Sequence, residues 1–144
     1  MDILKHKNLT ISSKHSFNDL PKWFKEAETL NATVRCYLAK LERPHFRSCI
    51  FWDCGVWKNG VWEFGSWEGG IWLGGKWKYG DWWSGVWHNG IWNGGRWING
   101  VWLNGDWNGG IWENGTWFKG HYKKRVCIGF EQDKQEVHQK PILL

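Results

Sequence analysis

Residues 55–69 read GVWKNGVWEFGSWEG, a five-residue unit of glycine, any residue, tryptophan and two further residues. Tryptophan occupies every fifth position from Trp52 to Trp117, and Tyr122 takes the next aromatic place. A period of five fits neither the 3.6-residue turn of a helix nor the two-residue alternation of a long strand. Glycine recurs with the same period, and each glycine inside a helix would cost about 1 kcal/mol relative to alanine. The stretch is therefore predicted to be a repeat of very short strands joined by tight turns.

Two backbones fit this repeat. The first is a β-solenoid with four five-residue sides per coil, in which each tryptophan and the glycine two residues before it face inward. The second is an antiparallel meander of three-residue strands such as 56–58, joined by two-residue turns. Asn-Gly or Gly-Gly fills nine of the thirteen junctions from 59–60 to 119–120, which indicates positive φ in either structure.

Burial of the tryptophans separates the two structures. A meander would place its tryptophans along one face of a ribbon, and the polar flanks of this chain are too irregular to cover such a stripe. A solenoid buries every indole between coils about 4.8 Å apart, where each ring removes roughly 150–250 Å² from water. We therefore predict a mainly β fold, a short β-solenoid, with the meander as the alternative.

The unit Gly55-Val56-Trp57-Lys58-Asn59 resembles the pentapeptide-repeat proteins, which form right-handed quadrilateral β-helices. In that family a small residue, usually alanine, and a larger apolar residue two positions later, usually leucine or phenylalanine, both face inward. Here glycine and tryptophan take these two places in every unit. The resemblance covers about half of the chain and implies a quadrilateral β-helix.

Two weaker likenesses accompany it. MORN repeats also contain Gly-x-Trp-x-x-Gly within a longer unit, although the strict period of five here is shorter. Tryptophan-rich repeats of this kind are also loosely similar to uncharacterised proteins of phages and other viruses.

The segments on either side of the repeat are expected to close its ends. Residues 1–51 read as an α/β capping region, with a strand over 3–11, a helix from about 17 to 30 and a strand over 32–41. Residues 52–122 form the repeat. Residues 123–144 read as a closing strand, over 126–130, followed by a polar tail. Solenoids need such caps because an open coil exposes backbone edges and core.

Charge and targeting signals narrow the function. The net charge is +5, yet residues 52–120 carry five basic and six acidic side chains and are almost neutral. A neutral rod cannot imitate the phosphate density of DNA. The chain has no run of eighteen apolar residues and no signal-peptide core at its N-terminus. We expect no membrane association and a cytoplasmic or virion-associated location.

Catalytic and metal-binding patterns are missing from the sequence. Cys36, Cys49, Cys54 and Cys127 form no Cys-x-x-Cys pair, and we expect them to be reduced, buried thiols. A zinc site built from three of them with His45 would match no established ligand spacing. No nucleophile elbow, phosphate loop or redox motif occurs. We predict that the protein is not an enzyme and binds no cofactor or metal.

The remaining hypotheses concern binding. In the first, the chain is a structural or interaction scaffold, possibly of a virus or phage, that binds a protein partner or itself. Its evidence is a set of apolar side chains directly after the repeat tryptophans, where residues should point outward. These candidate partner-binding residues are Leu73, Trp83, Ile98, Leu103 and Phe118.

The second hypothesis makes the tryptophans themselves the binding surface, stacking on single-stranded nucleic acid or carbohydrate. Stacking is worth about 1–3 kcal/mol per base, but it requires the meander, with its rings open to water. The basic cluster Lys123, Lys124 and Arg125 is the candidate phosphate contact. This is the alternative function.

Overall fold

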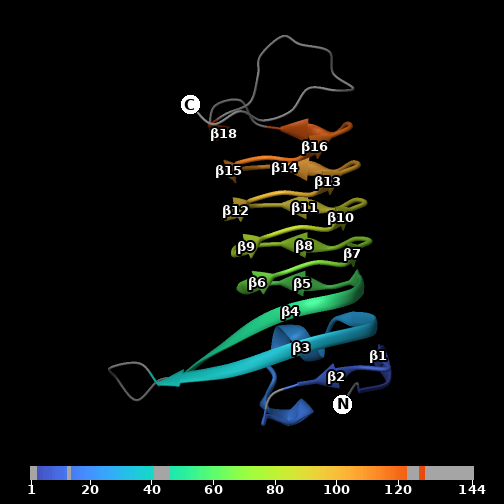
Figure 1. Cartoon of the computed structure of the whole chain (residues 1–144), viewed down its shortest axis with the longest axis vertical. Helices are drawn as coiled ribbons and strands as arrows, with labels where there is room; N and C mark the ends of the chain where they lie inside the picture. Colours follow the sequence, from blue (N-terminus) through green and yellow to red (C-terminus); the bar gives the residue numbers. More distant parts are fainter. Residues whose placement is uncertain (1–2, 13, 41–45, 123–126, 129–144) are drawn as a thin grey trace.

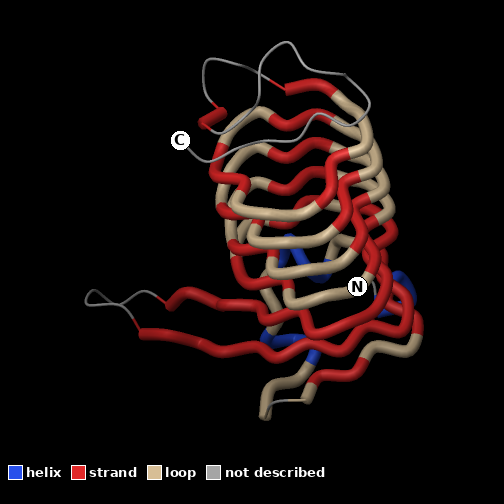
Figure 2. Tube along the Cα trace, turned by 45° about the horizontal axis from the view of Figure 1, so that its top comes forward, coloured by secondary structure: helices blue, strands red, loops and turns tan. Residues whose placement is uncertain are grey.

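The protein is a three-sided stack of parallel β-strand coils on an N-terminal cap (Figures 1 and 2). The structure is a computed structural model that describes residues 3–12, 14–40, 46–122 and 127–128. The β-solenoid expected from the sequence is confirmed, with about five coils. The antiparallel meander is wrong, because neighbouring strands within the repeat pair in parallel.

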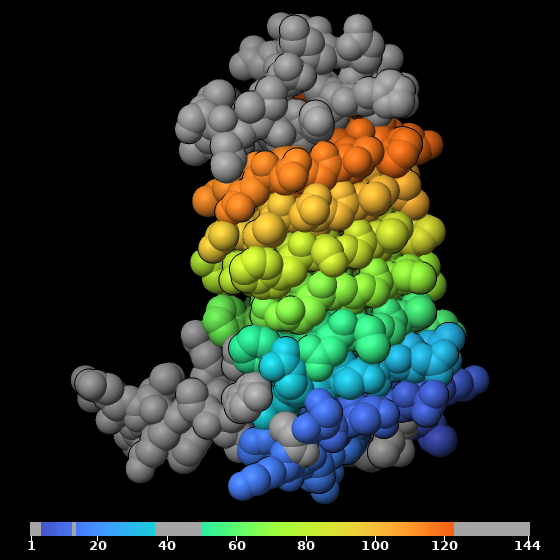
Figure 3. Space-filling model, viewed as in Figure 1, coloured from blue at the N-terminus to red at the C-terminus, as the bar shows by residue number. Residues whose placement is uncertain are grey.

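Strand register sets the length of one coil at fifteen residues. Trp57 pairs with Trp72, and Trp62 pairs with Trp77. Three five-residue units therefore complete a coil, which corrects the quadrilateral coil of twenty residues implied by the family resemblance. The stack consequently holds more coils than four sides would allow, and Figure 3 shows them as successive layers along the long axis.

The three sides are named here faces A, B and C. Face A contains part of β4 (Phe46–Asn59), followed by β7 (Ile71–Trp72), β10 (Val86–Trp87), β13 (Val101–Trp102) and β16 (Thr116–Trp117). Face B contains β5 (Val61–Trp62), β8 (Lys76–Trp77), β11 (Ile91–Trp92), β14 (Asp106–Trp107) and β17 (His121–Tyr122). Face C begins with the earlier part of β4 and continues through β6 (Gly65–Trp67), β9 (Asp81–Trp82), β12 (Arg96–Trp97), β15 (Gly110–Trp112) and β18 (Cys127–Ile128).

The fourteen repeat tryptophans form the core of the stack, each at most 1% exposed. Each face contributes one column of stacked indoles, with centroids 4.6–5.1 Å apart and planes within 7° of parallel. Tryptophans on adjacent faces meet edge to face, as Trp82 and Trp87 do at 5.8 Å and 71°. Offset stacks and edge-to-face pairs are the two arrangements that aromatic rings favour.

Glycine forms every corner of the repeat because no other residue fits there. Gly100 has φ +127°, and a Cβ atom on it would lie 2.6 Å from the carbonyl oxygen of Gly85 in the preceding coil. The same Cβ would lie 3.0 Å from the indole nitrogen of Trp82. A side chain at this position would therefore point along the stack, toward the corner of the coil below. The sequence-based expectation of a small side-chain slot facing the interior is corrected accordingly.

Corner geometry and ring size together account for three sides instead of four. A triangular coil turns more sharply at each corner than a square one, and only glycine populates the φ range of +103° to +138° found at these corners. Three indoles per coil already touch one another across the axis. A fourth side would separate the rings and open an axial void, which destabilises a fold in proportion to its volume.

Backbone hydrogen bonds join successive coils at two points on each side. The Lys76 N–H donates to the Gly60 carbonyl at 3.0 Å, and the Lys78 N–H donates to the Trp62 carbonyl at 2.8 Å. Some indoles add a third bond, as when Trp72 Nε1–H donates to the Asn89 carbonyl at 3.1 Å. Backbone hydrogen bonds between the strands and hydrogen bonds from the core indoles therefore hold the coils in one register.

The cap is less regular than the repeat. The N-terminal segment forms η1 (Ile3–Lys5), β1 (His6–Lys7) and β2 (Thr10–Ile11), which corrects the single strand expected over 3–11. The predicted helix of about 17–30 is much shorter, because only η2 (Phe17–Asp19) and α1 (Lys22–Lys25) are helical. The next strand, β3, then begins early and covers Glu28–Lys40.

Strand β3 links the cap to the repeat. It pairs in parallel with β1 and β2 and antiparallel with β4. The β3–β4 hairpin projects from the side of the stack in Figures 1 and 2. Because β4 runs from Phe46 to Asn59, one strand leads from the cap into the first coil.

The cap also fixes two polar side chains. The backbone N–H of Ser16 donates to the Asp19 carboxylate at 2.9 Å, which lowers the pKa of that carboxyl from its ordinary value. The imidazole of His6 is buried, with Nδ1 2.8 Å from Thr29 Oγ1 and the ring stacked on Phe24 at 5.0 Å. The His6 contacts tie the first segment to β3 and α1, whereas the Ser16–Asp19 contact is local to the start of η2.

At the far end of the stack, the tryptophans of the last coil are still buried. Trp112 and Trp117 of the last coil are each only 1% exposed, and Tyr122 packs edge to face on Trp117 at 5.9 Å. The predicted closing strand is present in part as β18, while residues 126 and 129–130 lie outside the described residues. β18 pairs with Gly110–Ile111 of β15.

Over the described ranges, the chain contains no helix of the length and apolarity needed to cross a bilayer.

Candidate functional site

Each repeat strand presents two side chains to the outside, one before and one after its tryptophan. Because the tryptophan points inward, its two neighbours point outward by the alternation of a strand. Residues fifteen apart then stack in columns along each face. The three faces carry different columns, so the exterior of the stack has three distinct surfaces around one uniform core.

Face A is an apolar surface. Before the tryptophans it carries a β-branched column of Val56, Ile71, Val86, Val101 and Thr116. After them it carries Leu73, Leu103 and Phe118, together with Lys58 and His88. Ile71, Leu73 and Phe118 are 38–40% exposed. The face has no carboxylate among its ten outward side chains.

Face B carries more polar side chains than face A, and several of them pair across adjacent coils. Lys78 Nζ lies 3.9 Å from Glu63 Oε2, and His121 Nδ1 lies 3.5 Å from Asp106 Oδ1. Asn108 Nδ2 donates to the carbonyl oxygen of the Asn93 side chain at 2.9 Å. These neighbours come from adjacent coils and satisfy each other, which is typical of a solvated face.

Face C combines acidic and aromatic side chains. Four of the six carboxylates of residues 52–120 lie on it, at Asp53, Glu68, Asp81 and Glu113. Trp83 and Ile98 follow the tryptophans of β9 and β12 on the same face. Trp83 is 44% exposed, and its Nε1–H donates to Ser66 Oγ at 3.0 Å.

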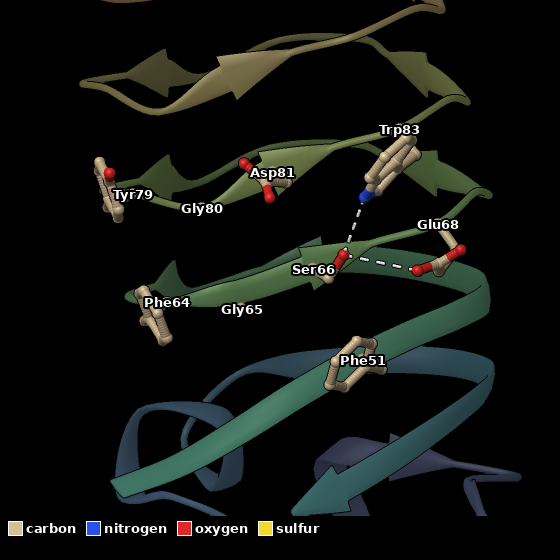
Figure 4. A pocket seen from close by; sticks show the side chains of 9 residues that line it. All are labelled: Phe51, Phe64, Gly65, Ser66, Glu68, Tyr79, Gly80, Asp81 and Trp83. Carbon is tan, nitrogen blue, oxygen red and sulfur yellow. Dashed lines mark hydrogen bonds between the residues drawn. The ribbon is translucent and has the colours of Figure 1, made fainter.

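A groove of about 530 Å³ opens on face C at the second and third coils. Its floor consists of Gly65, Ser66 and Gly80. Figure 4 shows Phe64 and Tyr79 one above the other along one side, with Trp83 and Glu68 on the other side. Phe51 lies at the end toward the cap, and Asp81 stands between the aromatic walls.

The Phe64–Tyr79 wall is built by the repeat itself. The two rings stand fifteen residues apart, at the corner between faces B and C, with centroids 6.0 Å apart and planes 6° from parallel. The equivalent position in the next coil is Gly94, so the wall ends at Tyr79. Volumes of this size and a mixture of aromatic and polar lining are common in small-ligand and side-chain binding sites.

The candidate partner-binding residues from the sequence divide between two faces. Leu73, Leu103 and Phe118 lie together on face A, whereas Trp83 and Ile98 lie on face C. The basic cluster Lys123, Lys124 and Arg125 lies outside the described residues. Sequence reasoning missed the groove because it treated all positions after tryptophan alike. The fifteen-residue spacing of Phe64 and Tyr79 was the available signal.

The cysteines differ in exposure. Cys36 is a buried free thiol, as expected, but Cys54 is a free thiol on the surface, which corrects the expectation that all four are buried. In the part of the chain that the structure describes, no three histidine, cysteine, aspartate or glutamate side chains gather as metal ligands. His45, the histidine of the possible zinc site, lies outside the described residues.

Comparison of the chain with protein-family models, curated proteins and solved structures gave no match. The five-residue tryptophan repeat therefore rests on the sequence and the β-solenoid on the structure, without support from a related protein. The finer resemblance to pentapeptide-repeat proteins is limited to the five-residue unit, since the coil is three-sided.

Proposed function

We propose that the protein is a non-catalytic interaction scaffold that contacts other protein molecules through face A. The observation that carries the proposal is the apolar surface of face A, where Ile71, Leu73 and Phe118 are 38–40% exposed and none of the ten outward side chains is a carboxylate. Contiguous exposed apolar surface on a soluble protein is typical of a contact site. The interior supports a structural role, because indole rings offer no group for nucleophilic attack and no general base.

The size of face A limits the strength of a contact made through it alone. Five coils present ten outward side chains, whereas a stable protein interface uses roughly 20–30 residues on each side. We therefore expect self-association through face A to be weak. A tight complex requires a larger protein that also reaches a neighbouring face. The scaffold would then act as a component of an assembly.

The alternative of an exposed tryptophan ladder for nucleic acid or carbohydrate lacks its physical basis. Stacking on a ligand requires an accessible ring face, and the fourteen repeat indoles are buried against one another.

Light scattering of the full chain across a wide concentration range tests the proposal. We expect a mass that rises above the monomer at high concentration. The double variant Leu73→Lys/Leu103→Lys should remain monomeric, because each lysine places a charge in the apolar column. The matched control Asn93→Lys/Asn108→Lys changes the same positions of face B and should behave as the parent. A parent and a face A variant with identical mass at all concentrations would contradict self-association through face A.

A further inference from the structure

The carboxylates in the face C groove are left without a basic partner among the described residues, although two arginines lie close by. Arg96 pairs with Asp81 in the strand register, directly one coil above it. Its guanidinium nevertheless turns away and binds Glu113 in the next coil, with Nη2 2.9 Å from Oε2. Glu68 accepts only a long hydrogen bond from Ser66 Oγ, at 3.4 Å.

The other arginine, Arg35 of β3, is held at the end of face C nearest the cap. Its Nε and Nη2 donate to both carboxylate oxygens of Asp53 at 2.8–3.2 Å. Its guanidinium carbon lies 4.8 Å from the centroid of the Phe51 ring. The pairing of Arg35 with Asp53 leaves the negative charge of Glu68 and Asp81 uncompensated in the groove.

Arg35 also shows how this face binds a guanidinium group. Phe51 and Asp53 flank the buried Trp52, and together they hold the cation between an aromatic ring and a carboxylate. Two coils further along, the same two outward positions hold Asp81 and Trp83, again a carboxylate and an aromatic ring but in the reverse order along the strand. In the groove these residues face open space instead of an arginine of the chain itself.

We propose that the face C groove binds an arginine side chain of a partner protein. The guanidinium plane enters between Trp83 and the Phe64–Tyr79 wall, and its N–H groups donate to the carboxylates of Asp81 and Glu68. Arginine suits this groove better than lysine because its planar, weakly hydrated head stacks on aromatic rings and donates in a fork to carboxylates. Cations over aromatic faces gain further attraction from the ring quadrupole.

The groove and face A are separate surfaces, so binding of arginine here does not depend on contacts through face A. The groove lies on β6 and β9, and face A lies on β7, β10 and their neighbours. A protein that presents an arginine to face C could also cover the corner toward face B. The two proposals can therefore fail independently.

Titration of the isotope-labelled full chain with short peptides tests the groove. The probe is a blocked Gly-Arg-Gly peptide, and the controls carry citrulline, a neutral isostere of arginine, or lysine in its place. The readout is the indole N–H resonance of Trp83, which is identified by its loss in Trp83→Phe. We expect saturable shifts with the arginine peptide at millimolar concentrations, weaker shifts with lysine and none with citrulline.

Two variants locate the binding site. Asp81→Asn should weaken binding of the arginine peptide roughly three- to tenfold, as expected for loss of one partly exposed charge contact. Asp106→Asn removes a carboxylate from the same position of face B and should leave the affinity unchanged. Tyr79→Ala removes one exposed aromatic wall and provides a second test should Asp81→Asn fail to fold.

Several results would overturn the inference. The first is binding of the citrulline or the lysine peptide as tight as that of the arginine peptide. The second is an equal affinity of Asp81→Asn and Asp106→Asn for the arginine peptide. The third is no shift of the Trp83 resonance up to the solubility limit of the arginine peptide. A neutral trisaccharide that moves the Trp83 resonance when the arginine peptide does not would instead identify the groove as a carbohydrate site.

Discussion

The repeat and the cap form corners in the same stack with different residues. Every corner of the repeat is a glycine with φ between +103° and +138°, and from Gly70 onward each corner glycine lies directly on the glycine of the coil below. The corners of the cap include Asn8 and Asn31, with φ of 58° and 54°, a left-handed conformation that asparagine tolerates. The Asn8 side chain donates to that of Asn31 at 2.8 Å. Corners that stack directly on one another in identical coils thus require glycine. The cap is a single irregular layer, so its corners can carry side chains that hydrogen-bond to each other.

The two regions also fill their interiors differently. The repeat uses one residue type in three columns, so each ring touches copies of itself. The cap ends these columns with unlike side chains, as Phe24 packs 6.0 Å from Trp57 and Trp23 packs 5.2 Å from Trp62. Below the first corners, the small residues Ala27 and Ala32 take the place of glycine. Regular packing therefore extends a stack, and mixed packing terminates it.

The largest expected effect on stability is at a glycine corner of the repeat. Gly100→Val should destabilise the protein by about 2–6 kcal/mol, because backbone strain of about 1–3 kcal/mol adds to overpacking of about 1–3 kcal/mol. Its neighbour Asn99→Ser should stay within about 1 kcal/mol, since it loses only a local bond to the Gly100 N–H. Chemical denaturation measures both changes. Equal midpoints for the two variants would mean that the corner does not require glycine.

The next largest loss of stability is expected for a tryptophan in the interior of the repeat, compared with one in the cap. Trp87→Ala should cost about 3–5 kcal/mol, as for other large buried side chains, because its ring stacks at 4.7 Å and 4.8 Å on rings of both neighbouring coils. Trp23→Ala in the cap should cost less, about 1–3 kcal/mol, because Trp23 is only partly buried. Thermal unfolding followed by calorimetry gives both values. A Trp87→Ala protein that melts within a degree or two of the parent would contradict the buried columns.

A smaller effect is expected at the corner of the cap. Asn31→Gly should change stability by less than about 1 kcal/mol, because glycine relieves left-handed strain while the exposed bond from Asn8 is lost. Asn31→Val should be worse by about 1–2 kcal/mol, since a β-branched residue is strained at positive φ. Denaturation midpoints of the two variants test this order. A reversed order would show that the Asn8–Asn31 bond dominates the corner.

The smallest effect on stability, and a clear spectroscopic one, concerns Trp83. Trp83→Phe should leave the melting temperature almost unchanged, because the ring is 44% exposed. The emission of the parent should be blue-shifted relative to free tryptophan, since fourteen indoles are buried. Most of the fraction quenched by iodide should disappear in the variant. Extensive quenching that persists in Trp83→Phe would show that repeat indoles are accessible.

Much of the fold follows from the sequence, because period and residue size act locally. The five-residue spacing and the recurrent Asn-Gly and Gly-Gly pairs predict short strands with positive φ at the corners. The size of tryptophan predicts its burial. The number of sides is a property of pairing between coils, and the four sides expected both from the repeat and from the resemblance to a quadrilateral family were wrong. Two signals pointed to three sides: glycine at every corner without exception, and the β-branched residues Val56, Ile71, Val86 and Val101 at intervals of fifteen.

The candidate site was predictable only in part. Apolar residues after tryptophan were correctly expected on the exterior, but their division between faces A and C depends on the coil length. The groove requires Phe64 to lie under Tyr79, which only a coil of fifteen residues brings about. The short helix of the cap was overestimated because residues 28–30 pair with β4 as part of β3, and tertiary pairing overrides a helical pattern of that length.

Disulfide formation between engineered cysteines tests the three-sided coil most directly. Asn93 and Asn108 are fifteen residues apart and contact each other across adjacent coils of face B, so Asn93→Cys/Asn108→Cys meets the Cα separation of about 4.4–6.8 Å that a disulfide needs. His88→Cys/Asn108→Cys, twenty residues apart, places its thiols on different faces. Mild oxidation and peptide mapping should show a 93–108 bridge and no 88–108 bridge. An 88–108 bridge without a 93–108 bridge would contradict the three-sided coil and the tryptophan columns built on it.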